Sequence, residues 1–287
     1  MFRAYLELIR PPNVATAFAD VLAGFAIAGR GNPTALPWLL GASACLYAGG
    51  VVLNDLFDRH LDAVERPERP LPSGRVPVSR AAQLGGGFVA CGVLAAFAAG
   101  PVAGVVAGVL AVSILLYDAL LKRQAVLGPL AMGGCRGLNL VLGMAAVPAS
   151  LSASWPLALV TVAYITGVTV VSRGEVSGGQ RVASGLALVL VSGALAALAG
   201  LSIGPDRLSM AGLVLTAALA ARVLPAFWAA YRRPDPATVR RAVKRGVLSL
   251  VLVDAVFGVV YASLAYGGLI LATGLLAGYL SRFFFVT

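Results

Sequence analysis

The chain has 287 residues, of which 59% are hydrophobic and only 12% are charged, and its mean hydropathy is +0.90. Soluble domains carry about a quarter charged residues, so the composition excludes a soluble globule, whose surface must be largely polar. It indicates a protein whose solvent is lipid, and the 34 glycines suit helices that approach one another closely inside a membrane.

Ten apolar runs follow one another along the chain, each near the ~20 residues that a membrane-spanning helix needs. We expect spans at residues 13–30, 36–54, 79–99, 101–120, 128–149, 155–173, 182–203, 207–231, 244–265 and 267–285. The last two are so close that the total is nine or ten. The runs are continuous, without the alternating polarity of a membrane β-barrel. The predicted fold class is therefore all-α, a polytopic membrane helical bundle of nine or ten transmembrane helices. No polar segment is long enough for a second core, so residues 1–287 are expected to form a single domain.

The net charge of +10 has a simple explanation in the order of the connections. Of the 22 Lys and Arg residues, 18 lie at the N-terminus, in alternate connections and in the tail, within residues 3–10, 59–80, 122–123, 173–181, 232–245 and 282. This is the positive-inside pattern, which predicts that these segments are cytoplasmic. Because topology accounts for the basic excess, we expect membrane lipid around the chain and no nucleic acid partner.

The densest polar segment, NDLFDRHLD, begins where the second span ends. On a helix, positions i, i+3 and i+7 share a face, so the carboxylates of Asp55, Asp58 and Asp62 would point together. Such close like charges repel one another unless a cation lies between them. Oxygen ligands suit Mg²⁺, with substrate phosphates completing its shell. A solvated acidic helix end is the alternative for this motif taken alone.

The next segment, AVERPERPLPSGRVPVS, favours the metal over the solvated helix end. Its prolines stop the helix and stiffen the loop. Arg66, Arg69 and Arg75 supply planar cations that suit phosphate oxygens. Acidic ligands followed by arginines would be a poor site for a bare cation, but they suit a metal-bridged diphosphate.

Residues 54–81 closely resemble the first signature of the UbiA superfamily of intramembrane prenyltransferases, NDxxDxxxD followed by R-P-L-x-x-G-x-[IV]. The segment YDALLKR resembles a further Tyr and Lys/Arg pair of that family. The resemblance implies a helical bundle around a central cavity that opens to the cytoplasmic side. It also implies Mg²⁺-dependent transfer of a prenyl group from an isoprenyl diphosphate to an acceptor. In that reading Asp55, Asp58 and Asp62 hold the metal, and the diphosphate or pocket residues near them include Asn54, Arg66, Arg69, Tyr117, Lys122 and Arg123.

One segment departs from the family pattern. Most members have a second aspartate-rich motif after the sixth span, whereas this chain has VSRGEVSGG, with Glu175 as its only acid and Arg173 beside it. Glu175 could assist a metal or act as a general base toward a hydroxyl, and Arg173 could bind a phosphate oxygen. Loss of the second metal and an ordinary charged turn are the alternatives. The same segment and residues 54–76 also resemble the EboC-like branch, which implies a bacterial inner membrane.

Charged residues inside spans are costly and usually face a cavity or one another; here they are Asp20, Arg136, Arg222 and Asp254. Interhelical salt bridges are the structural explanation for them. Arg136 and Asn139 lie about two turns into the fifth expected span, at a depth that reaches the predicted pocket. Asn13 resembles a pocket asparagine of the family, with a helix N-cap as the alternative.

Together these features predict an intramembrane prenyltransferase with catalytic Asp55, Asp58, Asp62 and Glu175. The acceptor is unidentified, either an aromatic compound or a polar alcohol. A transporter or flippase of an isoprenoid or small polar solute is one alternative, although the polar residues cluster on one side of the membrane. A non-catalytic relative that binds isoprenyl diphosphate is the other, suggested by the reduced second motif.

Overall fold

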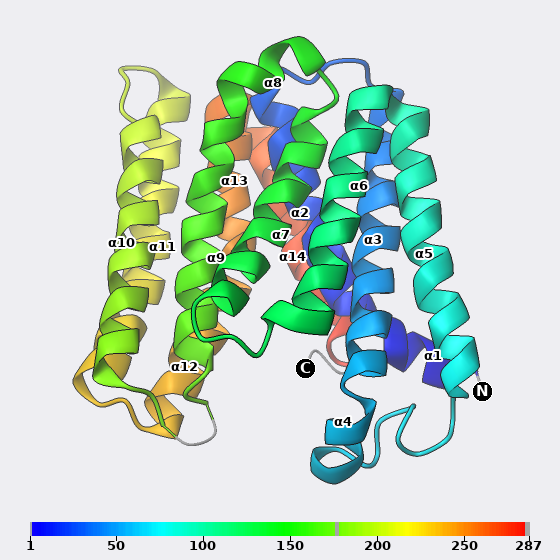
Figure 1. Cartoon of the computed structure of the whole chain (residues 1–287). Coiled ribbons are helices and arrows are strands. Elements are labelled where there is room, and N and C mark those ends of the chain that lie inside the picture. The colour runs from blue at the N-terminus through cyan, green and yellow to red at the C-terminus, as the bar shows by residue number, and fades with distance from the viewer. Residues whose placement is uncertain (1, 176–177, 285–287) are drawn as a thin grey trace.

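The computed structural model describes residues 2–175 and 178–284, and within them it is built from helices alone, without a strand (Figure 1). The all-α prediction is confirmed. The α-helices are α1 (Phe2–Ile9), α2 (Pro11–Ile27), α3 (Ala35–Phe57), α4 (Arg59–Glu65), α5 (Val78–Ala99), α6 (Pro101–Leu116), α7 (Leu127–Met144), α8 (Pro148–Ser154), α9 (Ala158–Ser172), α10 (Arg181–Leu201), α11 (Arg207–Arg232), α12 (Pro236–Leu248), α13 (Leu250–Tyr261) and α14 (Leu264–Leu280). A π-helical turn, η1 (Tyr117–Leu121), extends α6, and a 3₁₀ turn, η2 (Trp155–Leu157), precedes α9.

Six helical segments are long and apolar enough to cross a membrane: Ala35–Phe57, Val78–Ala99, Pro101–Leu121, Pro148–Ser172, Arg181–Leu201 and Arg207–Arg232. The chain is therefore a membrane protein, while nine or ten spans stay a prediction. The expected span 244–265 does not form one helix, because α12 ends at Leu248 and α13 begins at Leu250. The break at Ser249 separates the polar, basic α12 from the buried α13.

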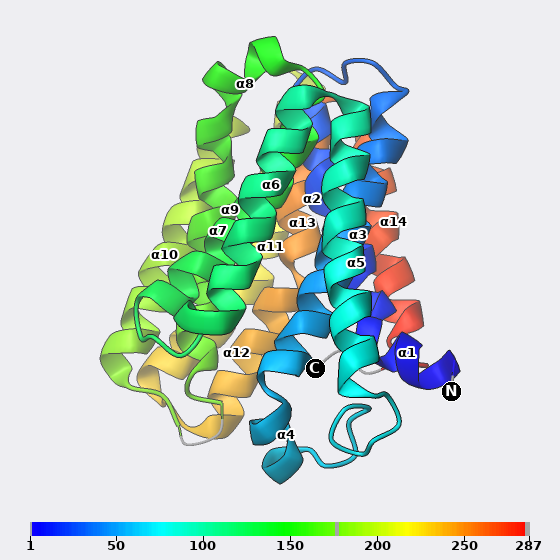
Figure 2. The ribbon, with the colours of Figure 1, turned by 45° about the vertical axis from the view of Figure 1, so that its right-hand side comes forward.

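The helices stand side by side, and α2 lies at the centre of the bundle, in contact with α3, α7, α13 and α14 (Figure 2). Its crossing with α7 depends on two glycines. A β-carbon at Gly24 would overlap the carbonyl oxygen of Leu140, and one at Gly143 would overlap that of Val21. Small residues permit this close approach of lipid-embedded helices, and the approach brings the polar residues of α2 beside those of α7.

The connections that carry the basic residues gather at one end of the bundle. We call it the basic end; it is formed by α1, α4, residues 66–77 and α12, which lie at the bottom of Figure 1. The opposite end carries α8 and the α5–α6 turn. This arrangement arises because each long helix runs from one end of the bundle to the other. Alternate connections therefore lie at the same end.

Candidate functional site

A cavity of about 290 Å³, which we call the main cavity, lies between α2, α3, the α6–η1 segment and α7. Its wall is apolar at Leu46, Leu110, Ile114 and Met132. Five of the predicted pocket residues line it, namely Asn13, Asn54, Tyr117, Arg136 and Asn139. Asn13 is the third residue of α2, whose N-cap is Arg10, so the N-cap alternative for Asn13 is wrong. The cavity therefore combines an apolar wall with several polar lining residues.

The acidic motif lies where α3 meets α4. The helix is interrupted at Asp58, although the backbone N–H of Asp62 still donates to the Asp58 carbonyl oxygen at 2.8 Å. Asp55 and Asp62 are buried, with 3% and 5% of their surface exposed. Buried carboxylates need cationic or hydrogen-bonding partners, and both of these have them.

Asp55 and Asp62 share one arginine. Arg69 Nη1 lies 2.8 Å from Asp62 Oδ2 and 3.4 Å from Asp55 Oδ1. Arg10 Nη2 donates to the same Asp55 oxygen at 2.5 Å. A guanidinium therefore occupies the space between the two carboxylates, as a cation must when like charges lie so close.

Asp58 has different partners. Lys122 Nζ lies 2.7 Å from Asp58 Oδ2 and donates to Asn54 Oδ1 at 2.9 Å. Arg123 Nη2 is 3.9 Å from Asp58 Oδ1. The structure thus brings the YDALLKR segment to the acidic motif. Lys122 contacts Asn54, although 68 residues separate them along the chain.

The three aspartates do not converge as one set. In the described part of the chain, no group of three or more His, Cys, Asp and Glu side chains is placed to hold a metal ion. The reason is the interruption at Asp58, where the carboxylate pairs with Lys122 while Asp55 and Asp62 share Arg69. Mg²⁺ is commonly bound by one or two carboxylates plus substrate phosphates. The pair Asp55 and Asp62 already surrounds one cation, so these residues fit Mg²⁺ that arrives with a diphosphate.

Two further residues of the site were not predicted from the sequence. Arg10 has a left-handed backbone, with φ of 52°, which for a residue other than glycine persists only where its surroundings hold it. Asp118 is buried on the π-helical turn that also carries Tyr117, and such turns are frequent at functional sites. Two features of the sequence could have indicated these residues. Arg10 precedes the two prolines that begin α2, and Asp118 is an acidic residue next to Tyr117.

Arg66 lines a second cavity, of about 260 Å³, that also reaches Arg10, Arg69 and Asp55. Arg66 is exposed at the surface of the loop after α4. Its predicted place near the diphosphate site stays a prediction, because Asp58 and Lys122 lie outside the lining of this cavity.

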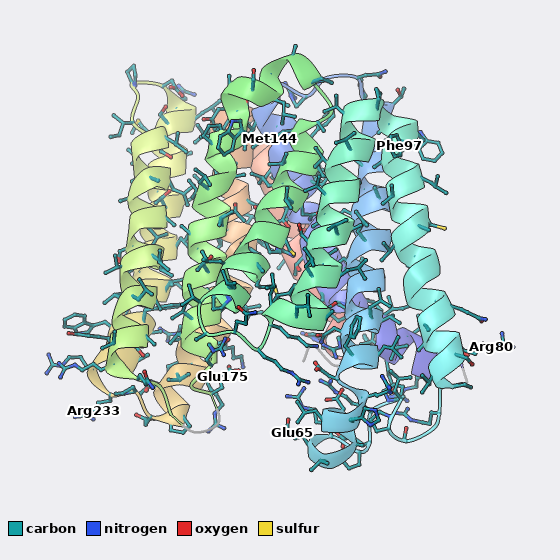
Figure 3. The ribbon with its side chains drawn as sticks, viewed as in Figure 1. Glu65, Arg80, Phe97, Met144, Glu175 and Arg233 are labelled. Carbon is teal, nitrogen blue, oxygen red and sulfur yellow. The ribbon has the colours of Figure 1, made fainter. Side chains whose placement is uncertain are left out.

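Glu175, which follows α9, lies at the basic end (Figure 3). Arg173 donates to the backbone carbonyl oxygens of Gln124 and Arg123, at 2.6 and 3.0 Å, and lines neither cavity. It therefore anchors the segment that carries Lys122. Burial raises the pKa of the half-buried Glu175, and the guanidinium groups of Arg240 and Arg66 oppose this rise. Arg66 of the loop that follows the acidic motif thus lies within electrostatic range of Glu175.

A separate polar cluster lies deep in the bundle. Asp20 is fully buried, Arg136 Nε lies 3.1 Å from its Oδ2, and Asn139 Nδ2 donates to the same oxygen at 2.8 Å. The expected interhelical salt bridge is confirmed for this pair. Arg222 instead donates to the hydroxyl of Ser249 at 3.1 Å. The carboxylate oxygens of Asp254 are buried and have no hydrogen-bond partner among the described residues.

Comparison with known proteins identifies the family of the chain. The family model for the UbiA prenyltransferase family matches residues 17–245. The digeranylgeranylglyceryl phosphate synthase of Ignicoccus hospitalis is 38% identical over 141 residues, which are 49% of this chain and 46% of that protein. That of Methanopyrus kandleri is 36% identical over 151 residues, which are 51% of this chain and 56% of that protein. The chain spans about half the length of the curated relatives it matches.

Solved structures share the fold. A structure described as digeranylgeranylglyceryl phosphate synthase in membranes has a TM-score of 0.69 and 21% identity, covering 90% of this chain and 98% of the other. A UbiA homologue from Archaeoglobus fulgidus bound to GPP and Mg²⁺ has a TM-score of 0.63 and 15% identity, covering 94% and 99%. With a family model that matches well over half of its length, this chain belongs to the UbiA prenyltransferase family.

Proposed function

We propose that the chain is an intramembrane prenyltransferase that moves an isoprenyl group from an allylic isoprenyl diphosphate to the hydroxyl of a glyceryl phosphate lipid, with Mg²⁺. The observation that carries the proposal is an apolar-walled cavity lined by Asn54, which accepts a hydrogen bond from Lys122, the partner of Asp58. The acceptor class comes from the relatives, whose name specifies a prenylated glyceryl phosphate as product. The sequence alone predicted either an aromatic compound or a polar alcohol as acceptor. On the basis of the relatives, we propose the polar alcohol.

The donor would bind in two halves. Its isoprenyl chain would lie against Leu46, Leu110 and Ile114 of the main cavity. Its diphosphate would lie at the rim, where Lys122 and Arg123 supply positive charge. Asp55 and Asp62 would hold Mg²⁺, and the phosphate oxygens would complete its coordination shell. With Asp55 and Asp62 holding Mg²⁺, Arg10 and Arg69, their present partners, would be available to bind anionic oxygens.

The reaction exchanges one carbon–oxygen bond for another. The allylic C–O bond breaks and its electron pair leaves with the diphosphate, whose charge Mg²⁺ held by Asp55 and Asp62 would neutralise as a Lewis acid. The hydroxyl oxygen of the acceptor forms the new bond to the allylic carbon and gives up its proton to a base. Glu175 is our candidate for that base, from the connection opposite the acidic motif. The apolar walls exclude water, which would otherwise react with the allylic carbon.

The gathering of basic connections at one end supports a cytoplasmic orientation of that end. A cavity that opens there, nine or ten spans and a single domain over residues 1–287 belong to the same proposal. The bacterial inner membrane and the EboC-like branch stay predictions from the sequence.

The test uses the purified full chain in nanodiscs with geranyl, farnesyl or geranylgeranyl diphosphate and a monoalkyl glyceryl phosphate. We expect release of inorganic diphosphate and a dialkyl product by mass spectrometry, both abolished by EDTA and restored by Mg²⁺. Binding of the donors without any diphosphate release would favour the non-catalytic relative. Movement of an intact donor across a vesicle membrane without turnover would favour the transporter.

A further inference from the structure

Four arginines gather around the second cavity, beside the acidic motif. We call it the arginine pocket; its charged lining is Arg10, Arg66, Arg69 and Arg75, together with Glu7, Glu68 and Asp55. The lining residues comprise four arginines and three acidic residues, and Asp62, outside the lining, pairs with one of these arginines, Arg69. Each guanidinium has five N–H donors in a planar fork that matches phosphate oxygens. The composition of the pocket points to an anionic ligand.

The ion pairs of the pocket leave donors available. Arg75 Nη1 lies 2.6 Å from Glu7 Oε2, and Arg75 Nη2 donates to the Glu68 carbonyl oxygen at 2.7 Å. Arg69 divides its interactions between Asp55 and Asp62, and Asp62 lies outside the lining. Among the described residues, no carboxylate lies within ion-pair distance of Arg66. An anion that enters would therefore meet guanidinium groups with unused N–H donors, above all that of Arg66.

The pocket lies at the level where the long helices end. Helix α1 crosses the basic end beside α3 and α5 (Figure 2), and its buried residues Ala4 and Leu8 belong to a small core with Val52 of α3 and Leu71 of the loop. Glu7 and Arg10 thus enter the pocket from the N-terminal segment. Lipid phosphates lie at this level of a bilayer, just beyond the hydrocarbon core. A lipid headgroup is therefore within reach of the pocket.

The two cavities meet at Arg10, which lines both. Asp58 and Lys122, which we assign to the donor diphosphate, lie outside the lining of the arginine pocket. A second phosphate group bound in the arginine pocket would consequently lie beside the main cavity, and Lys122 and Arg123 would stay available to the donor.

We infer that the arginine pocket binds the phosphate monoester headgroup of the prenyl acceptor, an inference that rests on the proposed function. A phosphate monoester carries between one and two negative charges and three terminal oxygens at neutral pH, which matches several guanidinium forks. Bound there, it directs the glyceryl hydroxyl past Arg10 toward the main cavity. Glu7 competes with the phosphate for Arg75 and sets the affinity of the pocket.

Two substitutions test this assignment in opposite directions. The metal-free full chain in nanodiscs of neutral lipid is titrated with a monoalkyl glyceryl phosphate. Arg75→Gln removes one phosphate partner, and we expect about tenfold weaker binding, the loss of one charge-assisted contact. Glu7→Gln removes the competitor for Arg75, and we expect binding about threefold tighter. A misfolded variant would not gain affinity, so Glu7→Gln keeps the test decisive if Arg75→Gln fails to fold.

The matched control is Arg80→Gln, which removes an exposed arginine at the start of α5 that points away from the bundle (Figure 3). It should bind the lipid as the unmodified chain does. The same monoalkylglycerol without its phosphate should bind all four proteins alike. Equal losses in Arg75→Gln and Arg80→Gln would overturn the inference, because they would indicate a general electrostatic attraction.

Two more ligands distinguish the sources of phosphate. Inorganic phosphate should bind far more weakly than the lipid; binding of equal strength and equal sensitivity to Arg75→Gln would overturn the lipid assignment. Geranylgeranyl diphosphate should bind Arg75→Gln normally, and a loss there instead would assign the pocket to the donor. If the chain binds the lipid phosphate as described but releases no diphosphate, the arginine pocket is supported and the proposed prenyl transfer is refuted.

Discussion

Two clusters of acidic and basic side chains differ in what they can do. The mouth cluster consists of Asp55, Asp58 and Asp62 with Arg10, Arg69, Lys122 and Arg123, and the buried cluster consists of Asp20, Arg136 and Asn139. In the mouth cluster, the Asp58 and Lys122 side chains are 18% and 13% exposed. In the buried cluster Asp20 has no exposed surface. A ligand can therefore reach the mouth cluster at Asp58 and Lys122, whereas Asp20 is sealed and its partners Arg136 and Asn139 border only the main cavity.

The partners also differ in how they are held. The mouth cluster joins connections and helix ends, whose side chains can exchange one cation for another when a ligand arrives. The buried cluster joins α2 to α7 at a crossing that Gly24 and Gly143 keep tight. Removing one member of a buried pair leaves an uncompensated charge in a medium of low dielectric constant. We expect substitutions at the mouth to act on turnover and those in the buried cluster to act on stability.

The largest effect is expected for Asp55→Asn. The change removes a carboxylate that we assign to Mg²⁺ and should lower turnover by about 10³-fold, or about 4 kcal/mol in activation free energy. Diphosphate release measures it, with the melting temperature as a check on folding. Glu65→Gln, which neutralises an exposed carboxylate of α4 (Figure 3), is the matched control. Full Mg²⁺-dependent turnover by Asp55→Asn would refute the assignment.

Arg136→Met should act mainly on stability. We expect a loss of about 3 kcal/mol in the free energy of unfolding, because Asp20 is left buried without its cation. Unfolding in detergent measures it, and the double variant Asp20→Asn with Arg136→Met should recover part of the loss. Arg222→Met, at an arginine that pairs only with a hydroxyl among the described residues, should cost less. If Arg136→Met melted like the unmodified chain, the contrast between the clusters would disappear.

Glu175→Gln tests the residue that we propose as the general base. As the proposed general base, Glu175 would contribute about 100-fold to turnover, and only its ionised form accepts a proton. Burial raises its pKa, so the ionised fraction falls as pH falls, beginning at a higher pH than for an ordinary glutamate. The acidic limb of the kcat profile should therefore vanish in Glu175→Gln. An unchanged limb would assign the proton transfer elsewhere.

Arg173→Gln should have the smallest effect. Its two hydrogen bonds to the backbone of Arg123 and Gln124 are exposed to solvent, so their loss should raise KM for the donor by about fivefold, or about 1 kcal/mol. The value of kcat should change little, because Arg173 acts through the placement of Lys122. A fall in kcat with unchanged KM would instead support direct contact with a phosphate oxygen.

Much of the fold and part of the site could be predicted from the sequence. The apolar runs predict helices because lipid leaves every backbone group to be satisfied within its own segment. The residues Asn54, Asp58 and Lys122 were expected near one another from their motifs, and the structure joins them. The break at Ser249 was not predictable, since the apolar pattern continues through it.

The sequence by itself determined which segments enter the membrane and which end of the bundle carries positive charge, because partition between lipid and water depends on each segment alone. Only the tertiary structure decided which basic residue pairs with which aspartate. Asp55 takes Arg10 from 45 residues away and Arg69 from 14 residues away, while Asp58 takes Lys122. Electrostatic attraction does not discriminate among the many arginines of this chain. The packing of α1, α3 and residues 66–77 brings particular guanidinium groups to particular carboxylates.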